Sequence, residues 1–487
     1  MLAILILALP VAAVFVNIFM GWRPSTPWVG VAADTAILFF GFTTALHDVH
    51  HQAVPAAAAG MLRVDSLSAF MVIVVGIVSL LASWGSVRYL RHEVATSSCT
   101  PRQAIQYAAL MQSFVAMMLL AVLAANIGIL WVAIEATTIT TTFLVGHRRT
   151  RGALEASWKY IVLCSVGIAL AFLGTVLVYL AAVHAGGHSL HALEWTWLST
   201  HAHSLSPPIM RLGLGLLVLG YGTKVGLVPM HSWLPDAHSQ APAPVSALMS
   251  GVLLSVAFYA LLRFKVIAVL CLGETYPRML FVTFAVLSLA LSSLLLLVQR
   301  DFKRALAYSS TEHMGLLALG AAAGGPLAIT GVLLHILGHG LAKGVLFLSS
   351  GELVLADGTS DVDKAGGLIY RRPALGGAIA MGLVALLGFP PFSLFVSELT
   401  MMRGEMANHL AWAVGLSLVA LAIAFAGLAT IGRRLLLVVL PGQATGLATP
   451  WRAMAPLGVG LSLCASIGIF AWPFDGILHA AARLVTS

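Results

Sequence analysis

Fourteen apolar runs, each about as long as a membrane-spanning helix, constrain what this chain can fold into. A helix needs about 20 apolar residues to cross the hydrocarbon core of a bilayer. Of the 487 residues, 60% are hydrophobic and 9% are charged, whereas soluble domains carry about 25% charged residues. The sequence therefore predicts an all-α, polytopic membrane protein of about 14 transmembrane helices. The runs lie at residues 2–20, 29–46, 64–87, 104–123, 125–145, 157–182, 209–228, 243–264, 279–298, 304–323, 327–354, 374–402, 411–440 and 455–480.

Lysine and arginine are unevenly divided between the links that join these runs. Seventeen of the 26 lie in links after odd-numbered runs, and seven lie in links after even-numbered runs or at the C-terminus. Short cytoplasmic loops of inner-membrane proteins are enriched in these residues. The distribution predicts cytoplasmic odd-numbered links and both termini outside. Residues 1–20 lack a basic segment and a small-residue cleavage site, so we interpret them as a retained first helix.

Composition also excludes several classes of function. The net charge of +8 comes from basic residues in short loops, which is typical of membrane topology and not of a nucleic-acid groove. The four cysteines are scattered, with no CxxC spacing, so we expect no metal, haem or Fe–S ligation by this chain. The longest link, about 183–208, contains five histidines. Metal binding there is one interpretation, and a solvated polar loop is the interpretation we favour.

One stretch, from Lys224 to Gly251, combines a buried cation with helix-breaking residues. Lys224 lies about twelve residues into an apolar run, and an unpaired lysine at the centre of a membrane helix costs at least about 2.5–3.5 kcal/mol. Gly226 and Pro229 follow and predict a break in the helix. Broken backbone at membrane depth is tolerated inside protein or beside water. The stretch therefore predicts an internal, hydrated ion path, with polar candidates at His231, Asp236 and His238.

Three titratable residues recur at helical spacing in run 327–354. His335, His339 and Lys343 are four residues apart, so they share one face of a helix over about 12 Å. A single buried histidine is more often a satisfied core residue, but three groups in register suit proton transfer. Glu135, inside run 125–145, is a further intramembrane carboxylate and has the same functional interpretation.

A second break is predicted in run 374–402. Pro390 and Pro391 interrupt this run, and Glu398 follows them. Two interrupted helices in corresponding halves of a chain are typical of a transport site. We expect protons to pass from the histidine column to Glu398 and then outside. The alternative is that Glu398 serves structure alone by pairing with Arg403.

The motifs KVGLVPMHSWLPDAH, APAPVSAL, IEATT, YSSTEHMG and GFPPFSLFVSE carry a family resemblance. The chain resembles the proton-translocating, antiporter-like subunits of complex I, Mrp antiporters and group 4 hydrogenases, and most of all the hydrogenase-4 component F type. The resemblance covers roughly residues 60–405. It implies two inverted five-helix repeats, with breaks in helices 7 and 12, and these domains: 1–100, 101–266, 267–442 and 443–487.

The resemblance also implies roles for single residues. Glu135 of helix 5 is expected to pair with Lys224 of helix 7, and Lys159 is expected to modulate that pair as a relay. A nearby carboxylate favours a charged lysine and desolvation disfavours it, so the two effects together allow titration. Glu312 and His313 are further candidates on the proton path.

The family pattern is not matched everywhere. The family often has a lysine in helix eight, where this chain has Ser255, and the nearest cations are Arg263 and Lys265. Whether the half-channel at Ser255 conducts is therefore open.

The function implied is that of a proton-translocating subunit of a redox complex. We expect no cofactor in this chain, Fe–S and Ni–Fe centres in partner subunits, and other membrane and peripheral subunits as partners. The alternatives are a subunit of a cation/proton antiporter, a subunit of an ion-coupled inorganic-carbon uptake system, and a structural membrane module with a vestigial channel.

Overall fold

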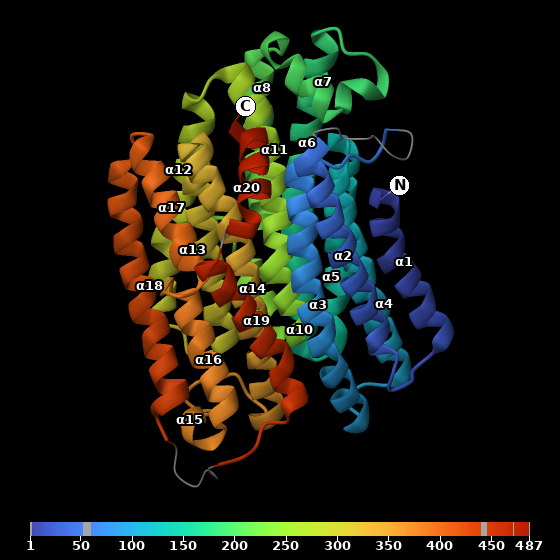
Figure 1. Cartoon of the computed structure of the whole chain (residues 1–487), viewed down its shortest axis with the longest axis vertical. Coiled ribbons are helices and arrows are strands. Elements are labelled where there is room, and N and C mark those ends of the chain that lie inside the picture. Colours follow the sequence, from blue (N-terminus) through green and yellow to red (C-terminus); the bar gives the residue numbers. More distant parts are fainter. Residues whose placement is uncertain (1, 52–59, 440–445, 471, 487) are drawn as a thin grey trace.

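The architecture is a bundle of helices that run along the long axis of the molecule (Figure 1). It is taken from a computed structural model that describes all residues except 1, 52–59, 440–445, 471 and 487. The described residues form helices and no strand, which confirms the predicted all-α class. The helices of the first half are α1 (Leu2–Met20), α2 (Pro27–His51), α3 (Ser66–Ala95), α4 (Pro101–Leu123), α5 (Ile127–Val145), α6 (Arg151–His184), α8 (Pro207–Val225), α9 (Trp233–Gln240), α10 (Ala243–Leu248) and α11 (Leu254–Leu272).

The second half continues in the same pattern, with short elements at the ends of the bundle. Its helices are α12 (Thr275–Leu296), α13 (Phe302–Ala323), α14 (Gly325–Asp357), α16 (Pro373–Leu386), α17 (Ser393–Ala407), α18 (Ala411–Leu437), α19 (Trp451–Ile469) and α20 (Trp472–Thr486). The short elements are η1 (Gly146–Arg148), η2 (Ser189–Leu193), α7 (Trp195–Thr200), η3 (Ala202–Ser204), η4 (Met249–Leu253) and α15 (Leu368–Arg371).

Eleven helical segments of the described chain are long and apolar enough to cross a membrane. The predicted runs at 209–228, 304–323 and 374–402 are not among them. They fold as α8, as α13 and as the pair α16 and α17, which have 14 and 15 residues and are each too short to span alone. The protein is therefore a membrane protein, and the figure of 14 spans stays a prediction.

The prediction of one continuous helix over 455–480 is wrong. Helix α19 ends at Ile469 and a separate helix, α20, begins at Trp472. Pro473 is the physical reason, because proline lacks the backbone N–H that would continue a helix and suits the first turn of a new one.

Polar N-caps fix where several long helices begin. The side chains of Asp65, Asn126 and Thr150 each accept a hydrogen bond from a backbone N–H in the first turn of α3, α5 and α6. Thr100 forms a reciprocal capping box with Gln103 at the start of α4. These side chains satisfy N–H groups that have no partner within a helix.

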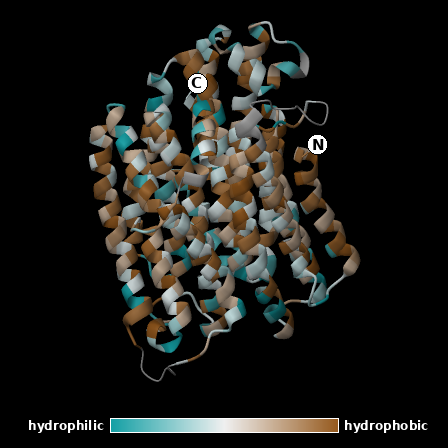
Figure 2. Cartoon of the chain, in the orientation of Figure 1, coloured by the Kyte–Doolittle hydropathy of each residue, from teal (hydrophilic) through white to brown (hydrophobic). Residues whose placement is uncertain are grey.

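Burial separates an inner from an outer set of helices. The most apolar stretches of α14 and of the α10–α11 segment are buried throughout, whereas α1 is mostly exposed. Figure 2 shows hydrophobic residues along the outer helices and hydrophilic residues at the two ends of the bundle. Because the inner helices do not face lipid, they can carry polar side chains that an outer helix could not.

Both termini and α7 lie at the same end of the molecule (Figure 1). Helix α8 starts at that end, beside α7, and α16 starts at the opposite end, beside α15. The two interrupted helices are therefore entered from opposite ends, in agreement with inverted repeats. Which end faces the cytoplasm stays a prediction, and the domain boundaries also remain predictions.

Asp65 joins α3 to α11 through an ion pair with Arg263 at 2.6 Å, and both side chains are almost fully buried. We expect Asp65→Asn to destabilise the protein by roughly 3–5 kcal/mol, because it leaves a buried guanidinium without a counter-charge. The measurement is thermal unfolding of the purified chain in detergent. The matched control is Asp363→Asn, which removes a carboxylate that is 43% exposed, and should cost less than about 1 kcal/mol. Equal shifts in the two variants would contradict this account.

Candidate proton-transfer site

The first interrupted helix ends where the sequence predicted. Helix α8 stops at Val225, and Gly226 caps it with a φ of +82°, a left-handed conformation that favours glycine. The chain then turns into α9 at Trp233. The indole Nε1 of Trp233 donates a hydrogen bond of 2.8 Å to the carbonyl of Thr223, which also accepts from the Gly226 N–H at 3.2 Å. The break is thus satisfied inside the protein, as backbone at membrane depth must be.

Lys224, in the last turn of α8, is completely buried. Its Nζ donates to the hydroxyl of Tyr160 at 2.7 Å and to the Oγ1 of Thr138 at 2.8 Å. The ammonium also lies 4.9 Å from the centre of the Tyr160 ring. Hydroxyl and aromatic groups therefore surround this cation, and among the described residues no carboxylate lies within ion-pair distance of it.

Thr138 connects Lys224 to Glu135. The Thr138 hydroxyl accepts from Lys224 and donates to the Oε2 of Glu135 at 3.2 Å. Ser165 of α6 donates to the other oxygen of Glu135 at 3.5 Å. The predicted Glu135–Lys224 pair is therefore bridged by a hydroxyl that can accept and donate at once.

Lys159 lies away from this pair. Its side chain is 48% exposed and forms ion pairs with Glu155 at 2.7 Å and with Asp236 at 3.2 Å. Asp236 also pairs with Arg304 at 3.0 Å. The next residue after Lys159, Tyr160, is the one that contacts Lys224. Among the described residues, Lys159 itself has no direct contact with Glu135 or Lys224.

Two histidines lie after the first break. His231 is half-buried, and its ring centre lies 6.4 Å from that of Tyr308 on α13. His238, on α9, is completely buried and stacks on Phe347 of α14 with ring centres 4.8 Å apart. Neither ring nitrogen of His238 has a hydrogen-bond partner in the described chain. The α9 helix thus brings a buried imidazole from the first break to the central helix.

The predicted column on α14 is present and buried along its length. The ring centres of His335 and His339 are 6.3 Å apart, and Lys343 continues the stripe. The Lys343 ammonium donates to the Leu306 carbonyl at 2.7 Å and to the Ser309 hydroxyl of α13.

His313, on α13, is part of this column. Its Nδ1 lies 3.0 Å from the Nε2 of His335, and its ring centre is 5.2 Å from that of His339. Hydrogen-bonded imidazoles can each accept a proton on one nitrogen and release it from the other. The column therefore spans two helices and contains three histidines, one more than the spacing on α14 alone predicted.

The second interrupted helix lies against the same column. Helix α16 ends at Leu386, α17 begins at Ser393, and Gly388 between them has a φ of +66°. The Ser397 hydroxyl lies 3.0 Å from the Nδ1 of His335. A Cβ on Gly388 would meet the Glu398 carboxylate, so the glycine leaves the space that this carboxylate occupies.

Glu398 reaches the column, as predicted. Candidate ligand atoms of His313, His335 and Glu398 all lie within 4.8 Å of one another. Its predicted structural partner, Arg403, is exposed and makes no ion pair with it in the described chain. The Oε1 of Glu398 is buried without a hydrogen-bond partner among the described residues.

Two imidazoles and a carboxylate also form a donor set that a divalent metal can use. The sequence predicted no metal ligation, and this cluster marks the place where such a site could form. The five histidines of the 183–208 link, by contrast, form no group of three metal ligands among the residues described there.

Several polar residues near the candidate site escaped the sequence prediction. Glu405, which was not among the candidates predicted from the sequence, is buried on α17, two turns beyond Glu398 and roughly 10 Å along the helix. Glu405 follows Glu398 by seven residues, or two helical turns, and this spacing could have indicated that both carboxylates lie on the same face of the helix. Lys303 is buried and donates to the Ala241 carbonyl at 2.6 Å, at the C-terminus of α9. The bridging hydroxyls of Thr138 and Tyr160 had no signal in the sequence.

A π-turn, η4, interrupts the central α10–α11 segment. Its Ser250 hydroxyl lies 2.7 Å from that of Ser310, next to the serine that contacts Lys343. Single π-turns inside helices occur frequently at functional sites. Ser255, at the position where the family often has a lysine, is buried without a partner in the described chain.

Many of the buried polar atoms without a protein partner lie on or beside these inner helices. Ordered water usually completes the hydrogen bonds of such groups. In the described chain, those near the proposed path belong to His231, His238, Ser255, Thr311, Glu312, His339, Ser349, Glu398 and Glu405, and others lie elsewhere, for example on Asn17, Gln112 and Arg371. The arrangement therefore suits a hydrated path between the two breaks.

Comparisons with known proteins place the chain in a family. The family model described as "NADH:quinone oxidoreductase/Mrp antiporter, TM" matches residues 124–424. The chain belongs to this family. Among its relatives, a "Hydrogenase-4 component F homolog" of Methylacidiphilum infernorum is 35% identical over 394 residues, which cover 81% of this chain and 82% of that protein. Hydrogenase-4 component B of Escherichia coli is 33% identical over 352 residues, covering 69% and 50%.

Solved structures show the family fold over the whole chain. A subunit of an archaeal membrane-bound sulfane sulfur reductase matches with a TM-score of 0.89 at 23% identity, covering 100% of this chain and 98% of that chain. A chain of the Mrp complex of Dietzia sp. matches at 0.83 and 18% identity, covering 100% and 97%. A chain of Thermus thermophilus complex I matches at 0.81 and 20% identity, covering 100% of both. The resemblance to this family predicted from the motifs is confirmed.

We expect Thr138→Val to lower proton translocation strongly, because valine keeps the shape of the side chain but removes the hydroxyl between Glu135 and Lys224. Thr138→Ser should retain most of the activity. The matched control is Thr137→Val, since the Thr137 hydroxyl bonds the Ile134 carbonyl of its own helix at 2.6 Å. Proton flux in proteoliposomes is the measurement, and an equal effect of both valine variants would refute the bridging role.

Proposed function

We propose that the chain is a proton-translocating membrane subunit of a multi-subunit redox complex. The observation that carries this proposal is the series of buried and half-buried titratable groups between two interrupted helices. It starts at Glu135 and Lys224, continues through His238 to the α14 column, and ends at Glu398 and Glu405. Intramembrane ionisable residues of this kind mark ion pathways and proton relays.

Hydroxyl groups and imidazoles, which can both accept and donate a proton, make such a series chemically competent. Each step needs a donor and an acceptor within hydrogen-bond distance, as at Lys224–Thr138–Glu135 and at His313–His335–Ser397. We propose that protons leave the column at Glu398 and pass to Glu405, on the side of both termini. The relay role of Lys159 becomes a weaker part of the proposal, because Asp236 and Glu155 hold its ammonium at the surface.

The relatives favour a redox complex over an antiporter. Two relatives with at least 33% identity carry hydrogenase-4 component names, whereas the likeness to the Mrp complex is at 18% identity and concerns the fold. We propose that other membrane subunits and peripheral subunits are partners, and that Fe–S and Ni–Fe centres are held by those partners. The four cysteines of this chain are distributed over distant helices and one link. This distribution supports the proposal that partner subunits carry out the redox chemistry.

Replacing Glu135 or Lys224, the two residues that Thr138 bridges, tests the proposal. We expect Glu135→Gln or Lys224→Ala to lower proton translocation by the assembled complex by about tenfold or more, while the complex still assembles. Glu274→Gln and Lys364→Ala are matched controls, since their side chains are 68% and 73% exposed. The measurement is proton uptake into proteoliposomes driven by the redox reaction. Normal translocation in both Glu135→Gln and Lys224→Ala would overturn the proposal.

A further inference from the structure

A long groove lies on the outer surface of the bundle, apart from the proton path. It has a volume of about 1140 Å³ and runs between α1 and α4 on one side and α5 and α6 on the other. Its body is lined by apolar side chains, which include Ile18, Leu110, Phe143 and Ile161. Phe143 is 63% exposed, so this apolar surface faces outward from the bundle.

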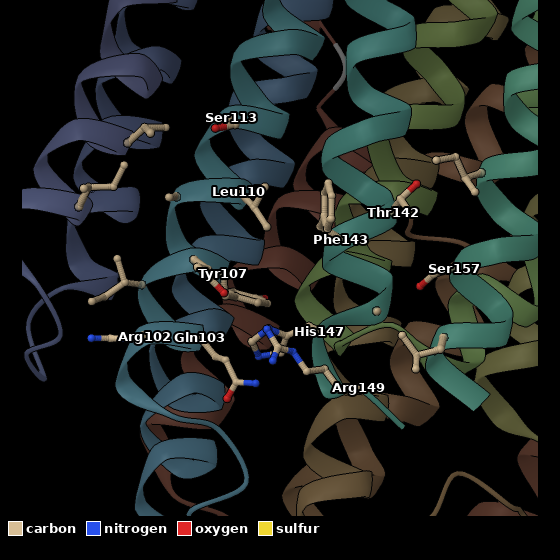
Figure 3. Close-up of a pocket in the computed structure, with 18 of the residues that line it drawn as sticks. Arg102, Gln103, Tyr107, Leu110, Ser113, Thr142, Phe143, His147, Arg149 and Ser157 are labelled. Carbon is tan, nitrogen blue, oxygen red and sulfur yellow. The ribbon is translucent and has the colours of Figure 1, made fainter. Parts of the chain in front are cut away.

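The mouth of the groove differs from its body in charge. Figure 3 shows Arg102, Gln103, His147 and Arg149 at one level, with Leu110 and Phe143 further along the groove. Arg102 belongs to the first turn of α4, and Arg149 lies in the short link before α6. The two arginines therefore stand on opposite walls of the same opening.

These two arginines form no ion pair within the part of the chain that the structure describes. Neither side chain forms a hydrogen bond or an ion pair with another residue of the described chain, and both are exposed. Their neighbour Arg148, in contrast, is paired with Glu93 at 3.2 Å. The two unpaired guanidinium groups at this opening are therefore available to an anion.

We propose that this groove binds an anionic phospholipid, with the phosphate at Arg102 and Arg149 and the acyl chains along the apolar body. Basic pockets between spanning helices on the cytoplasmic side are suited to anionic headgroups, and this end is the predicted cytoplasmic one. A phospholipid joins a phosphate to long apolar chains in one molecule, which matches both parts of the groove. A helix of a partner subunit would instead have to place two carboxylates opposite the arginines.

The test is binding of phosphatidylglycerol and phosphatidylcholine of identical acyl chains to the full-length chain in detergent, followed by native mass spectrometry. We expect the wild type to prefer phosphatidylglycerol. Arg102→Gln/Arg149→Gln should weaken binding of phosphatidylglycerol by roughly thirtyfold, since each arginine near a membrane surface contributes roughly fivefold. Binding of phosphatidylcholine should change little.

The control is Arg433→Gln/Arg452→Gln, which removes two exposed arginines at the same end of the molecule but outside the groove. It should keep the preference for phosphatidylglycerol. Thermal unfolding without added lipid should be equal in all three proteins, which separates loss of the site from loss of the fold. Glycerol phosphate, which has no acyl chains, should not compete.

Three results of the lipid-binding comparison would overturn the proposal, and so would one result of the competition experiment. The three are equal binding of both lipids by the wild type, a preference that survives in Arg102→Gln/Arg149→Gln, and equal losses in the control. Competition by glycerol phosphate at the same concentration would also overturn it, because it would show a phosphate site that does not use the apolar body. Equal binding of both lipids would leave a partner subunit's helix as the occupant of the groove.

Discussion

A group that can hydrogen-bond or carry charge must find its partner inside the protein when it lies at the depth of the hydrocarbon core. This constraint explains why the structure has an inner and an outer set of helices. The outer helices present apolar side chains, and α14 and the α10–α11 segment are enclosed by them. Enclosure permits features that would be untenable in lipid, among them two interrupted helices, a π-turn and the buried lysines Lys224 and Lys343.

Hydroxyl groups are partners of both buried lysines on the proposed path. Thr138 and Tyr160 hold Lys224, and Ser309 together with a carbonyl holds Lys343. A carboxylate in direct contact would hold each ammonium more firmly in its charged form, because the Coulomb attraction is large at low dielectric. A bridging hydroxyl keeps the carboxylate one hydrogen bond away. At Lys224 this arrangement gives the ammonium hydrogen-bond partners without a direct ion pair, which is compatible with the proposed role in proton transfer.

The spanning helices, the two breaks and the column on α14 could be predicted from the sequence, because they depend on local composition and spacing. Apolar length predicts the spanning helices, and Gly226, Pro229, Pro390 and Pro391 predict the two breaks. In the structure, Gly226 and Gly388 adopt left-handed backbone at these breaks. The spacing of His335, His339 and Lys343 places them on one face whatever packs against it. Contacts between distant helices were not predictable in this way. Three features depend on how the helices pack together: the Thr138 bridge, the contact between His313 and His335, and the surface ion pairs of Lys159.

His339 offers the most direct test of the central claim, that the buried column carries protons. It is completely buried, neither ring nitrogen has a protein partner in the described chain, and it lies between the His313–His335 pair and Lys343. The measurement is the number of protons translocated per electron by the assembled complex carrying His339→Leu. We predict a loss of about tenfold or more, with redox turnover retained when an uncoupler is present. A wild-type ratio of protons to electrons in this variant would contradict the account.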